Sequence, residues 1–368
     1  MRVYVDHTHV WRHVTGIERI TLQLFSQDAL RPLDVVPVNA RRMKDMVLKQ
    51  TFYLPACLAH SPSSLVLCPG FPPTPLLQLF RSRVIPYVHD VFLLSRREDL
   101  NWRAKAYSAW PFDLAVRRLP KFLVNTANTA AKLRQYCRQD ADITVYRPQA
   151  QNSFNLAVGE RASRPLHPKA LRLVALGTVE PRKNLVAAAR IVRALRARGF
   201  VDTALEVIGR RGWGEDWQTL AKMPDVTLHG YVPDEDIPAI LNGADALICT
   251  SYEEGLGLPL LEAQFAGLPV IAPDQPVFRE VLGSSGLFID PSDPGGAADV
   301  IAALTATDGW RAACVARAAA NLRDWNRKAA RDRDRVVTML SEFEHRGAHS
   351  QERHDHVTDF GRPARRQH

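Results

Sequence analysis

Short apolar runs alternate with longer polar or amphipathic stretches through the first third of the chain. Each run is rich in Val, Ile or Leu and is too short for a buried helix, so each predicts a β-strand. Because helical stretches separate the runs, they predict one Rossmann-like sheet of parallel strands. The predicted strands are 3–5, 35–38, 65–67, 84–88 and 122–124.

A second series of apolar runs follows residues 148–168, a stretch of Pro, Gly, Asn, Gln and Ser that we interpret as a linker. Its first strand leads to a helix with apolar positions from 185 to 195, which Asn184 is expected to cap and Gly199 to end. The predicted strands of this series are 171–177, 205–209, 226–229 and 246–250. Their alternation with helices predicts a second doubly wound α/β sheet.

The chain length supports the same division. Its 368 residues exceed the ~250–300 residues at which a single core stops growing. We predict domains at 1–160 and 161–322, a terminal helix at 323–344 and a tail at 345–368. The tail has almost no apolar residues, so we expect it to be disordered.

Composition narrows the cellular setting. The five cysteines lack metal-type spacing, which is typical of reduced thiols in a cytosolic protein. The first residues lack an apolar signal core, and no apolar run approaches the ~20 residues of a membrane-spanning helix. We therefore expect a cytoplasmic protein that is at most peripheral to the inner face of the membrane.

The formal charge of +9 comes from basic residues that are spread along the chain rather than gathered in one stretch. We therefore expect no nucleic-acid partner. The charge is typical of a solvated surface, and it would also attract anionic lipid headgroups or a charged lipid-linked acceptor. The sequence leaves these two interpretations open.

The segment from Ser251 to Glu262, with the sequence SYEEGLGLPLLE, carries the clearest candidate chemistry. Its glycines let the backbone approach a ligand, and Pro259 marks the start of a helix whose free amides favour a phosphate. Glu254 and Glu262 are separated by seven residues. Because carboxylates accept hydrogen bonds from hydroxyl groups, the segment suits a sugar nucleotide.

This segment resembles the signature of the family 4 retaining glycosyltransferases. Residues 176–184 resemble that family's phosphate-binding segment, 229–232 its base-contacting turn and 272–281 the stretch after its helix, whereas 15–19 and 87–90 match more loosely. The resemblance implies a GT-B fold, in which two Rossmann-like domains face a cleft. It also implies that the first domain holds the acceptor, the second the nucleotide sugar, and that the terminal helix crosses back to the first.

The resemblance also implies roles for individual residues. Arg182 and Lys183 would clamp the donor pyrophosphate, and their place between a strand and a helix supports this. Glu254 would contact the transferred sugar, Glu262 would accept the ribose hydroxyls, and His89 would approach the sugar and its phosphate. We take Glu254 and His89 as catalytic. Further donor contacts would come from Gly16, Gly230, Tyr231, Val232, Gly255, Leu256, Gly257 and Leu258.

Each of these residues also has an ordinary structural explanation. Arg182 and Lys183 could be an exposed basic pair, and Glu254 a surface acid beside Glu253. A carboxylate such as Glu262 in a first helical turn favours the helix dipole. His89 and Gly16 could support a strand end and a helix start.

Asp-x-Asp pairs occur at 140/142, 234/236 and 332/334, and such a pair binds a metal in the other large glycosyltransferase fold. Here the first pair lies in the first domain, Asp234 is expected to cap a helix, and the third pair alternates with arginines. We therefore expect no metal. Residues 212–214 lack the third glycine of a dinucleotide motif, so no nicotinamide cofactor is expected either.

The sequence thus predicts an enzyme, a hexosyltransferase whose co-substrate is a nucleoside-diphosphate sugar. The run from Glu180 to Asn184 resembles bacterial mannosyltransferases of surface-polysaccharide assembly, so GDP-mannose is the expected donor. The expected acceptor is a glycan or lipid-linked glycan. A GT-B sugar-nucleotide epimerase and a non-catalytic nucleotide-sugar-binding protein are the alternatives.

Overall fold

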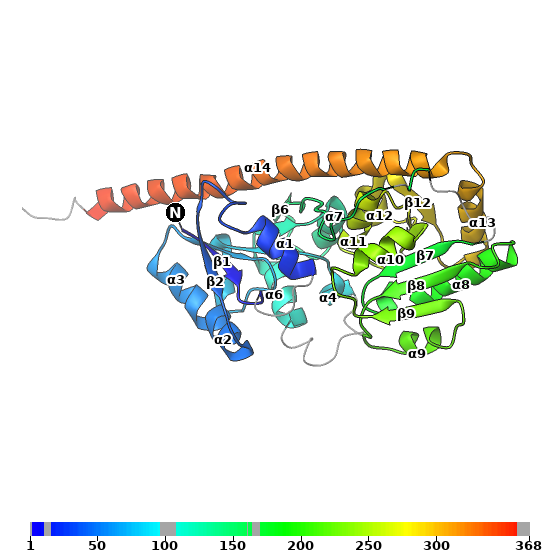
Figure 1. Cartoon of the computed structure of the whole chain (residues 1–368). Coiled ribbons are helices and arrows are strands. Elements are labelled where there is room, and N and C mark those ends of the chain that lie inside the picture. Colours follow the sequence, from blue (N-terminus) through cyan, green and yellow to red (C-terminus); the bar gives the residue numbers. More distant parts are fainter. Residues whose placement is uncertain (1, 11–15, 96–107, 160, 164–169, 359–368) are drawn as a thin grey trace, which may run out of the picture. The chain divides into compact units, whose positions relative to one another are not determined.

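The computed structural model describes residues 2–10, 16–95, 108–159, 161–163 and 170–358, with the backbone alone for 344–358. The chain divides into two compact units, Met1–Pro148 with Ala329–His368, and Gln149–Lys328. Figure 1 traces the elements along the chain.

The boundary between the units lies earlier than the expected division at 160/161. Part of the expected linker packs on the second unit, because the buried Arg161 guanidinium donates hydrogen bonds to three carbonyl oxygens there. These belong to Ala266 at 2.7 Å, Ala244 at 2.5 Å and Leu241 at 2.8 Å.

The first unit contains a six-stranded parallel sheet in the order β2-β1-β3-β4-β5-β6. All five predicted strands are present, and the edge strand β6 is additional. Its burial is only partial, which explains why its apolar pattern is weak. The strands are β1 (Arg2–His7), β2 (Asp34–Asn39), β3 (Leu65–Cys68), β4 (Val84–Val88), β5 (Lys121–Val124) and β6 (Asp142–Val145).

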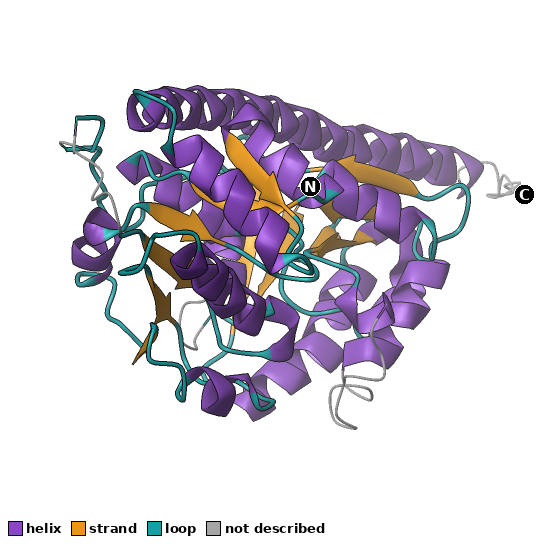
Figure 2. Cartoon of the chain, turned by 90° about the vertical axis from the view of Figure 1, so that its right-hand side faces the viewer, coloured by secondary structure: helices purple, strands orange, loops and turns teal. Residues whose placement is uncertain are grey.

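Helices flank the strands (Figure 2), and Leu54, Leu58, Phe112 and Val116 join strand residues in the core of the first unit. The helices of this unit are α1 (Gly16–Leu24), α2 (Met43–Leu48), η1 (Lys49–Tyr53), α3 (Leu54–His60), η2 (Leu77–Arg83), α4 (Phe92–Ser95), α6 (Trp110–Arg118) and α7 (Ala127–Arg134).

The second unit contains another six-stranded parallel sheet, in the order β12-β11-β10-β7-β8-β9. The predicted strands are present, and the sequence analysis missed β11 and β12. The strands are β7 (Arg172–Leu176), β8 (Ala204–Ile208), β9 (Val226–Gly230), β10 (Ala246–Ile248), β11 (Val270–Pro273) and β12 (Gly286–Ile289).

The core of the second unit joins its strands to two helices, whose buried residues include Ile191, Val192 and Leu195 on α8 and Ala298 and Ile301 on α13. The helices of this unit are η5 (Pro181–Lys183), α8 (Leu185–Ala197), α9 (Asp216–Leu220), α10 (Ile237–Gly243), α11 (Leu258–Ala263), η6 (Gln264–Ala266), α12 (Pro276–Leu282), η7 (Gly283–Ser285) and α13 (Pro294–Thr305).

The terminal helix α14 (Trp310–Thr358) is longer than expected in both directions. It starts before residue 323, in an alanine-rich stretch of strong helix formers. Its residues up to Lys328 belong to the second unit, and those from Ala329 belong to the first. It continues to Thr358, so residues 345–358 are helical where we expected disorder, and 359–368 lie outside the described residues.

Candidate functional site

The strand order of the second sheet reverses between two neighbours, β7 and β10. β8 and β9 follow β7 on one side, whereas β10 and β11 lie on the other side. Ligands of open α/β sheets bind at such a switch point, outside the carboxyl ends of the strands. The loops after β7 and β10 carry Arg182, Lys183 and Glu254, which are three of the predicted site residues.

The structure joins these three side chains directly, although Glu254 lies more than 70 residues from the two cations in the sequence. Lys183 Nζ lies 2.5 Å from Glu254 Oε1, and Arg182 Nη1 lies 3.4 Å from Glu254 Oε2. The Ser251 hydroxyl donates to Glu254 Oε1 at 2.7 Å. The expected pyrophosphate clamp and the expected sugar contact therefore form one charged cluster.

The cluster is held by residues that the sequence analysis did not single out. Arg182 donates from Nε and Nη2 to Glu180 Oε1, at 3.0 and 2.7 Å. The Thr250 hydroxyl donates to the Lys183 and Asn184 carbonyls. The only signal for Glu180 was its place in the same short motif, two residues before Arg182.

Glu254 is held in its ionised form. Burial of the carboxyl group raises its pKa, but the charges of Lys183 and Arg182 and the hydrogen bonds from Lys183 and Ser251 outweigh burial and lower it. Only 10% of the Glu254 side chain is exposed. The two cations of the site therefore face two carboxylates, since Glu254 pairs with Lys183 and Arg182 and Glu180 lies 2.7 Å from Arg182 Nη2.

The backbone around Lys183 depends on an unusual glycine. Gly177 has a φ of +136°, and a Cβ placed there would lie 3.3 Å from Lys183 Cε. A side chain at position 177 would therefore be strained and would crowd the lysine stem. Asn184 is the N-cap residue of α8, as expected, but it has a left-handed φ of 50° and its side chain makes no capping hydrogen bond.

Glu262 occupies a different position from the one expected. Helix α11 spans only Leu258–Ala263, which places Glu262 in its last turn rather than its first. The dipole explanation for this carboxylate therefore does not apply. The side chain is buried, with 3% exposure, and the loop before the helix contains Gly255, Leu256 and Gly257, the last with a φ of 74°.

The turn from Gly230 to Val232 begins at the last residue of β9, at the carboxyl edge of the sheet. Gly230 has a φ of 72°, and its carbonyl accepts a hydrogen bond from the Gly209 amide. Tyr231 is 63% exposed, and the Arg210 guanidinium lies 4.5 Å from the centre of its ring. An exposed ring of this kind can stack on a planar base.

His89 lies in the first unit, directly after β4. Its Nε2 lies 2.7 Å from the Pro69 carbonyl, which can only accept, so Nε2 carries the proton. Asn125 Nδ2 donates to the His89 carbonyl at 2.7 Å. Burial lowers the pKa of His89, so the imidazole is neutral at pH 7.

The His89 side chain lines a pocket of about 270 Å³ whose other walls are mainly apolar. Ile17, Phe71 and Phe92 are among its lining residues. Gly16, the residue before Ile17, is the first residue of α1, and residues 11–15 of the expected turn lie outside the described residues.

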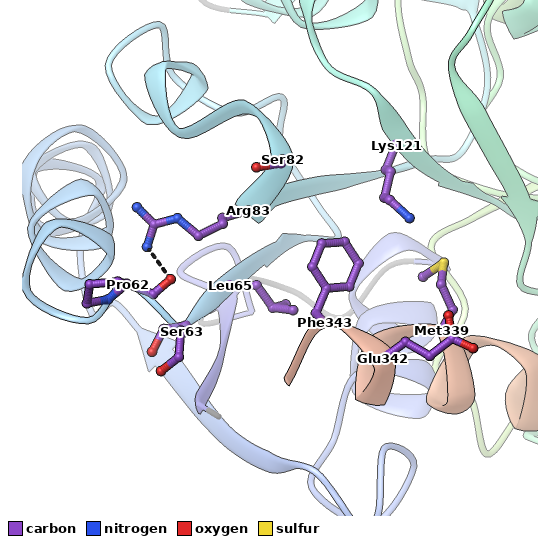
Figure 3. A pocket seen from close by; sticks show the side chains of 10 residues that line it. Pro62, Ser63, Leu65, Ser82, Arg83, Lys121, Met339, Glu342 and Phe343 are labelled. Atoms are coloured by element: carbon purple, nitrogen blue, oxygen red, sulfur yellow. Dashed lines mark hydrogen bonds between the residues drawn. The ribbon is translucent and has the colours of Figure 1, made fainter. Parts of the chain in front are cut away.

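A larger pocket of about 340 Å³ lies in the same unit but at the other edge of the sheet. Its residues precede or begin the strands: Arg83 comes just before β4, whereas Leu65 and Lys121 are the first residues of β3 and β5. Figure 3 shows Phe343 of α14 between Arg83 and Lys121. No predicted site residue lines this pocket.

Two of the three Asp-x-Asp pairs, 140/142 and 332/334, form ion pairs with Lys or Arg side chains. Asp332 is buried and accepts from Arg147 Nη1 at 2.5 Å, and Asp140 pairs with Arg138. Asp234 does not cap α10, because Asp236 occupies that position without a side-chain capping bond. Within the described ranges, no three or more His, Cys, Asp and Glu side chains are grouped to hold a metal ion.

Parts of the chain are similar in sequence to known glycosyltransferases. Residues 170–307 match the family model "Glycosyl transferases group 1". The O-antigen chain mannosyltransferase B of Escherichia coli is 33% identical over 156 residues, which are 41% of each chain. A serotype-specific mannosyltransferase of the same organism, WbdA, is 27% identical over 228 residues, 56% of this chain and 28% of that protein.

Solved structures extend the likeness in fold to both units. HepE from Anabaena, in complex with UDP and glucose, has a TM-score of 0.65 at 14% identity. The superposition covers 93% of this chain and 100% of the HepE chain. Sucrose-phosphate synthase from Thermosynechococcus elongatus has a TM-score of 0.67 at 13% identity, with 93% and 98% covered. The predicted GT-B fold is therefore confirmed.

Residues 170–307 are thus similar to glycosyl transferases of group 1, and the chain has a GT-B fold. It spans less than half the length of the two mannosyltransferases named above. Among the described helices, none combines the length and apolar character needed to cross a membrane.

Proposed function

We propose that this chain is a retaining hexosyltransferase that transfers mannose from GDP-mannose to a glycan or lipid-linked glycan in surface-polysaccharide synthesis. The observation that carries the proposal is the cluster of Arg182, Lys183 and Glu254 at the switch point of the second sheet. Two cations fixed beside a buried carboxylate suit a ligand that combines a diphosphate with a sugar.

In the proposed reaction, the bond between the sugar C1 and the diphosphate oxygen breaks while C1 bonds to an acceptor hydroxyl on the same face. The hydroxyl proton passes to the departing diphosphate. Arg182 and Lys183 stabilise the negative charge that builds up on the diphosphate, and Glu254 stabilises positive charge at C1. The neutral His89 approaches the sugar as a hydrogen-bond acceptor through Nδ1.

The choice of mannose rests on the relatives. Several of them are named mannosyltransferases, including the O-antigen mannosyltransferase RfbU of Salmonella typhimurium, which is 38% identical over 68 residues. The complexes of HepE contain UDP instead, so uridine nucleotides are the competing donors to test. We also propose that the enzyme works at the inner face of the membrane, where a lipid-linked acceptor is found.

A donor screen tests this proposal. GDP-mannose, GDP-fucose, UDP-glucose and UDP-N-acetylglucosamine are compared by thermal shift, since a ligand at 100 times its Kd adds ~2.7 kcal/mol of stability. Release of the diphosphate is then measured with and without a mannan acceptor. Acceptor-dependent release from GDP-mannose supports transfer. Release or isomerisation that needs no acceptor indicates an epimerase, and binding without turnover indicates a binding protein.

A further inference from the structure

Helix α2, η1 and α3 follow one another without a break in the first unit, where Figure 1 labels α2 and α3. This helical segment carries an exposed apolar surface. Five of the fifteen large hydrophobic side chains that are exposed in the described residues lie within residues 43–53 of this segment. They are Met43 (51% exposed), Val47 (44%), Leu48 (57%), Phe52 (61%) and Tyr53 (49%). We call this set the apolar face.

Helical geometry places these residues side by side. Met43 and Val47 are four residues apart, and the wider π-type turn of η1 brings Phe52, five residues further on, to the same side. Leu48 and Tyr53 repeat this five-residue step one position along the chain, so the two rows are adjacent. The face is therefore a continuous stripe rather than scattered single residues.

The opposite side of the segment is firmly attached to the unit. Leu54 and Leu58 are fully buried in the core, and Met46 is 6% exposed. Gln50 Nε2 donates to Asp6 Oδ2 and to the Thr8 hydroxyl, both at 2.9 Å, at the carboxyl end of β1. The exposed side chains thus sit on a preformed support, and binding through them would not require the segment to fold.

Positive charge surrounds the apolar face. Residues 41–60 contain four Lys and Arg residues and one acid, Asp45. Asp45 is paired with Lys49 at 3.3 Å. Among the described residues no acidic side chain forms an ion pair with Arg41, Arg42 or Lys44, and all three are exposed. The cations are therefore available to an outside anionic partner.

We propose that this surface, the apolar face with Arg41, Arg42 and Lys44, docks the chain on the anionic headgroups of a lipid bilayer. Leu, Phe and Tyr side chains flanked by Lys and Arg are the features by which a helix lies in the plane of a membrane interface. A second copy of the chain is the less suitable occupant, because it would bring the same cations against each other.

Docking here has a consequence for the site. Gln50 ties the segment to the same carboxyl edge of the first sheet at which His89 lies. A bilayer bound by the apolar face therefore lies against the unit that is expected to hold a lipid-linked acceptor. This inference extends the proposed membrane contact, but it does not depend on which sugar is transferred.

Sedimentation of the full chain with vesicles tests the inference without any donor. Vesicles of phosphatidylcholine with 30% phosphatidylglycerol, about the anionic content that attracts basic segments, should sediment the protein, and pure phosphatidylcholine should not. The double variant Leu48→Ser with Phe52→Ser should reduce the partition coefficient between vesicles and water by about tenfold or more, since both substitutions remove exposed apolar side chains that would be buried in the bilayer. Arg41→Glu with Arg42→Glu should reduce it by a similar factor.

Matched variants keep this test specific. Val201→Ser with Val300→Ser removes two exposed apolar side chains of the second unit, and Arg118→Glu with Arg190→Glu reverses two exposed charges outside residues 41–60. Both should bind vesicles as the unaltered chain does. Equal binding by Leu48→Ser with Phe52→Ser would overturn the proposal. So would a dimer in solution that this variant converts to a monomer while its vesicle binding is unchanged.

Failure of the docking inference can be distinguished from failure of the proposed glycosyl transfer. The Leu48→Ser, Phe52→Ser variant should retain full turnover on a soluble acceptor and lose it only on a vesicle-borne one. Loss of vesicle binding with normal turnover supports docking. A chain that binds vesicles through this face but transfers no sugar would contradict the proposed function and leave the docking inference supported.

Discussion

The carboxyl edges of the two sheets carry different chemistry. In the second unit this edge holds two cations and a buried carboxylate within ion-pair distance. In the first unit the same edge presents a neutral histidine and a mainly apolar pocket. The family model matches only the second unit. A nucleoside diphosphate needs fixed charge wherever it binds, whereas an acceptor glycan offers hydroxyl groups and apolar ring faces, which neutral and aromatic side chains can bind.

The substitution of Lys183 should have the largest effect on turnover if the charged carboxyl edge of the second sheet carries out the reaction. Lys183→Ala removes the cation closest to Glu254 and should lower turnover by about 10³, the upper range for one group that stabilises developing charge. Lys222→Ala, an exposed lysine of the same unit, is the control and should behave as the unaltered enzyme. Similar turnover for the two variants would remove Lys183 from the proposed clamp.

Glu254→Gln should have the next largest effect. It keeps the shape of the side chain but not its charge, and turnover should fall by roughly 10²–10³. The dependence of turnover on pH provides a second measurement. Because its pKa is lowered in the folded chain, Glu254 stays ionised as the pH falls below the usual carboxyl value.

The sign of the stability effect follows from the same shift. The ion pairs of Glu254 stabilise the folded state above the pKa of an unfolded glutamate, and this contribution is lost as the pH falls through the lower folded pKa. Unfolding of the unaltered chain and of Glu254→Gln should therefore differ most near neutral pH and converge in acid. A constant difference down to the acid limit would show that the pairing is not the cause.

His89→Gln should have a smaller effect on turnover, and it should show whether the carboxyl edge of the first sheet takes part in diphosphate binding. We expect turnover to fall by about tenfold, the scale of one neutral hydrogen bond, and affinity for GDP to be unchanged. Because burial lowers the pKa of His89, its protonation should not appear in the rate between pH 6.5 and 8. His60→Gln, an exposed histidine of the same unit, is the control. A loss of GDP affinity in His89→Gln alone would place the diphosphate at the first unit.

Chelation should have the smallest effect, which is none. In the proposed reaction, Arg182 and Lys183 supply the positive charge that a metal would otherwise place on the diphosphate. Turnover in EDTA is compared with turnover in added Mg²⁺ or Mn²⁺. Activity that EDTA abolishes and a metal restores would show that the two side chains do not neutralise the diphosphate alone.

Sequence patterns located most of the sheets, and two of the three missed strands share a physical cause. The buried run of β4 was predicted with its observed bounds, whereas the edge strands β6 and β12 are only partly buried and carry weak apolar patterns. β11 has four residues, and its end falls in residues 272–281, which the sequence analysis interprets as a family motif.

The composition of the site was predictable, but its pairing was not. Local motifs identified Glu254 and Lys183 separately, yet their contact depends on which strands are neighbours, and the chain crosses over between β7 and β10. The protonation of His89 depends on the Pro69 carbonyl, 20 residues away in the sequence. The predicted place of Glu262 in the first turn of its helix was wrong, because a short apolar run does not show where α11 begins and ends.

The most direct test of the account is calorimetry with GDP on two variants that alter the two glutamates. If Glu262 binds the ribose hydroxyls, as the resemblance implies, Glu262→Ala should weaken GDP binding by ~1.5–3 kcal/mol, while Glu254→Gln should change GDP affinity by no more than about threefold. Circular dichroism of both variants, with Glu262→Gln as a volume-matched control, shows that they remain folded. Loss of GDP binding in Glu254→Gln as severe as in Glu262→Ala would contradict the division between nucleotide and sugar contacts.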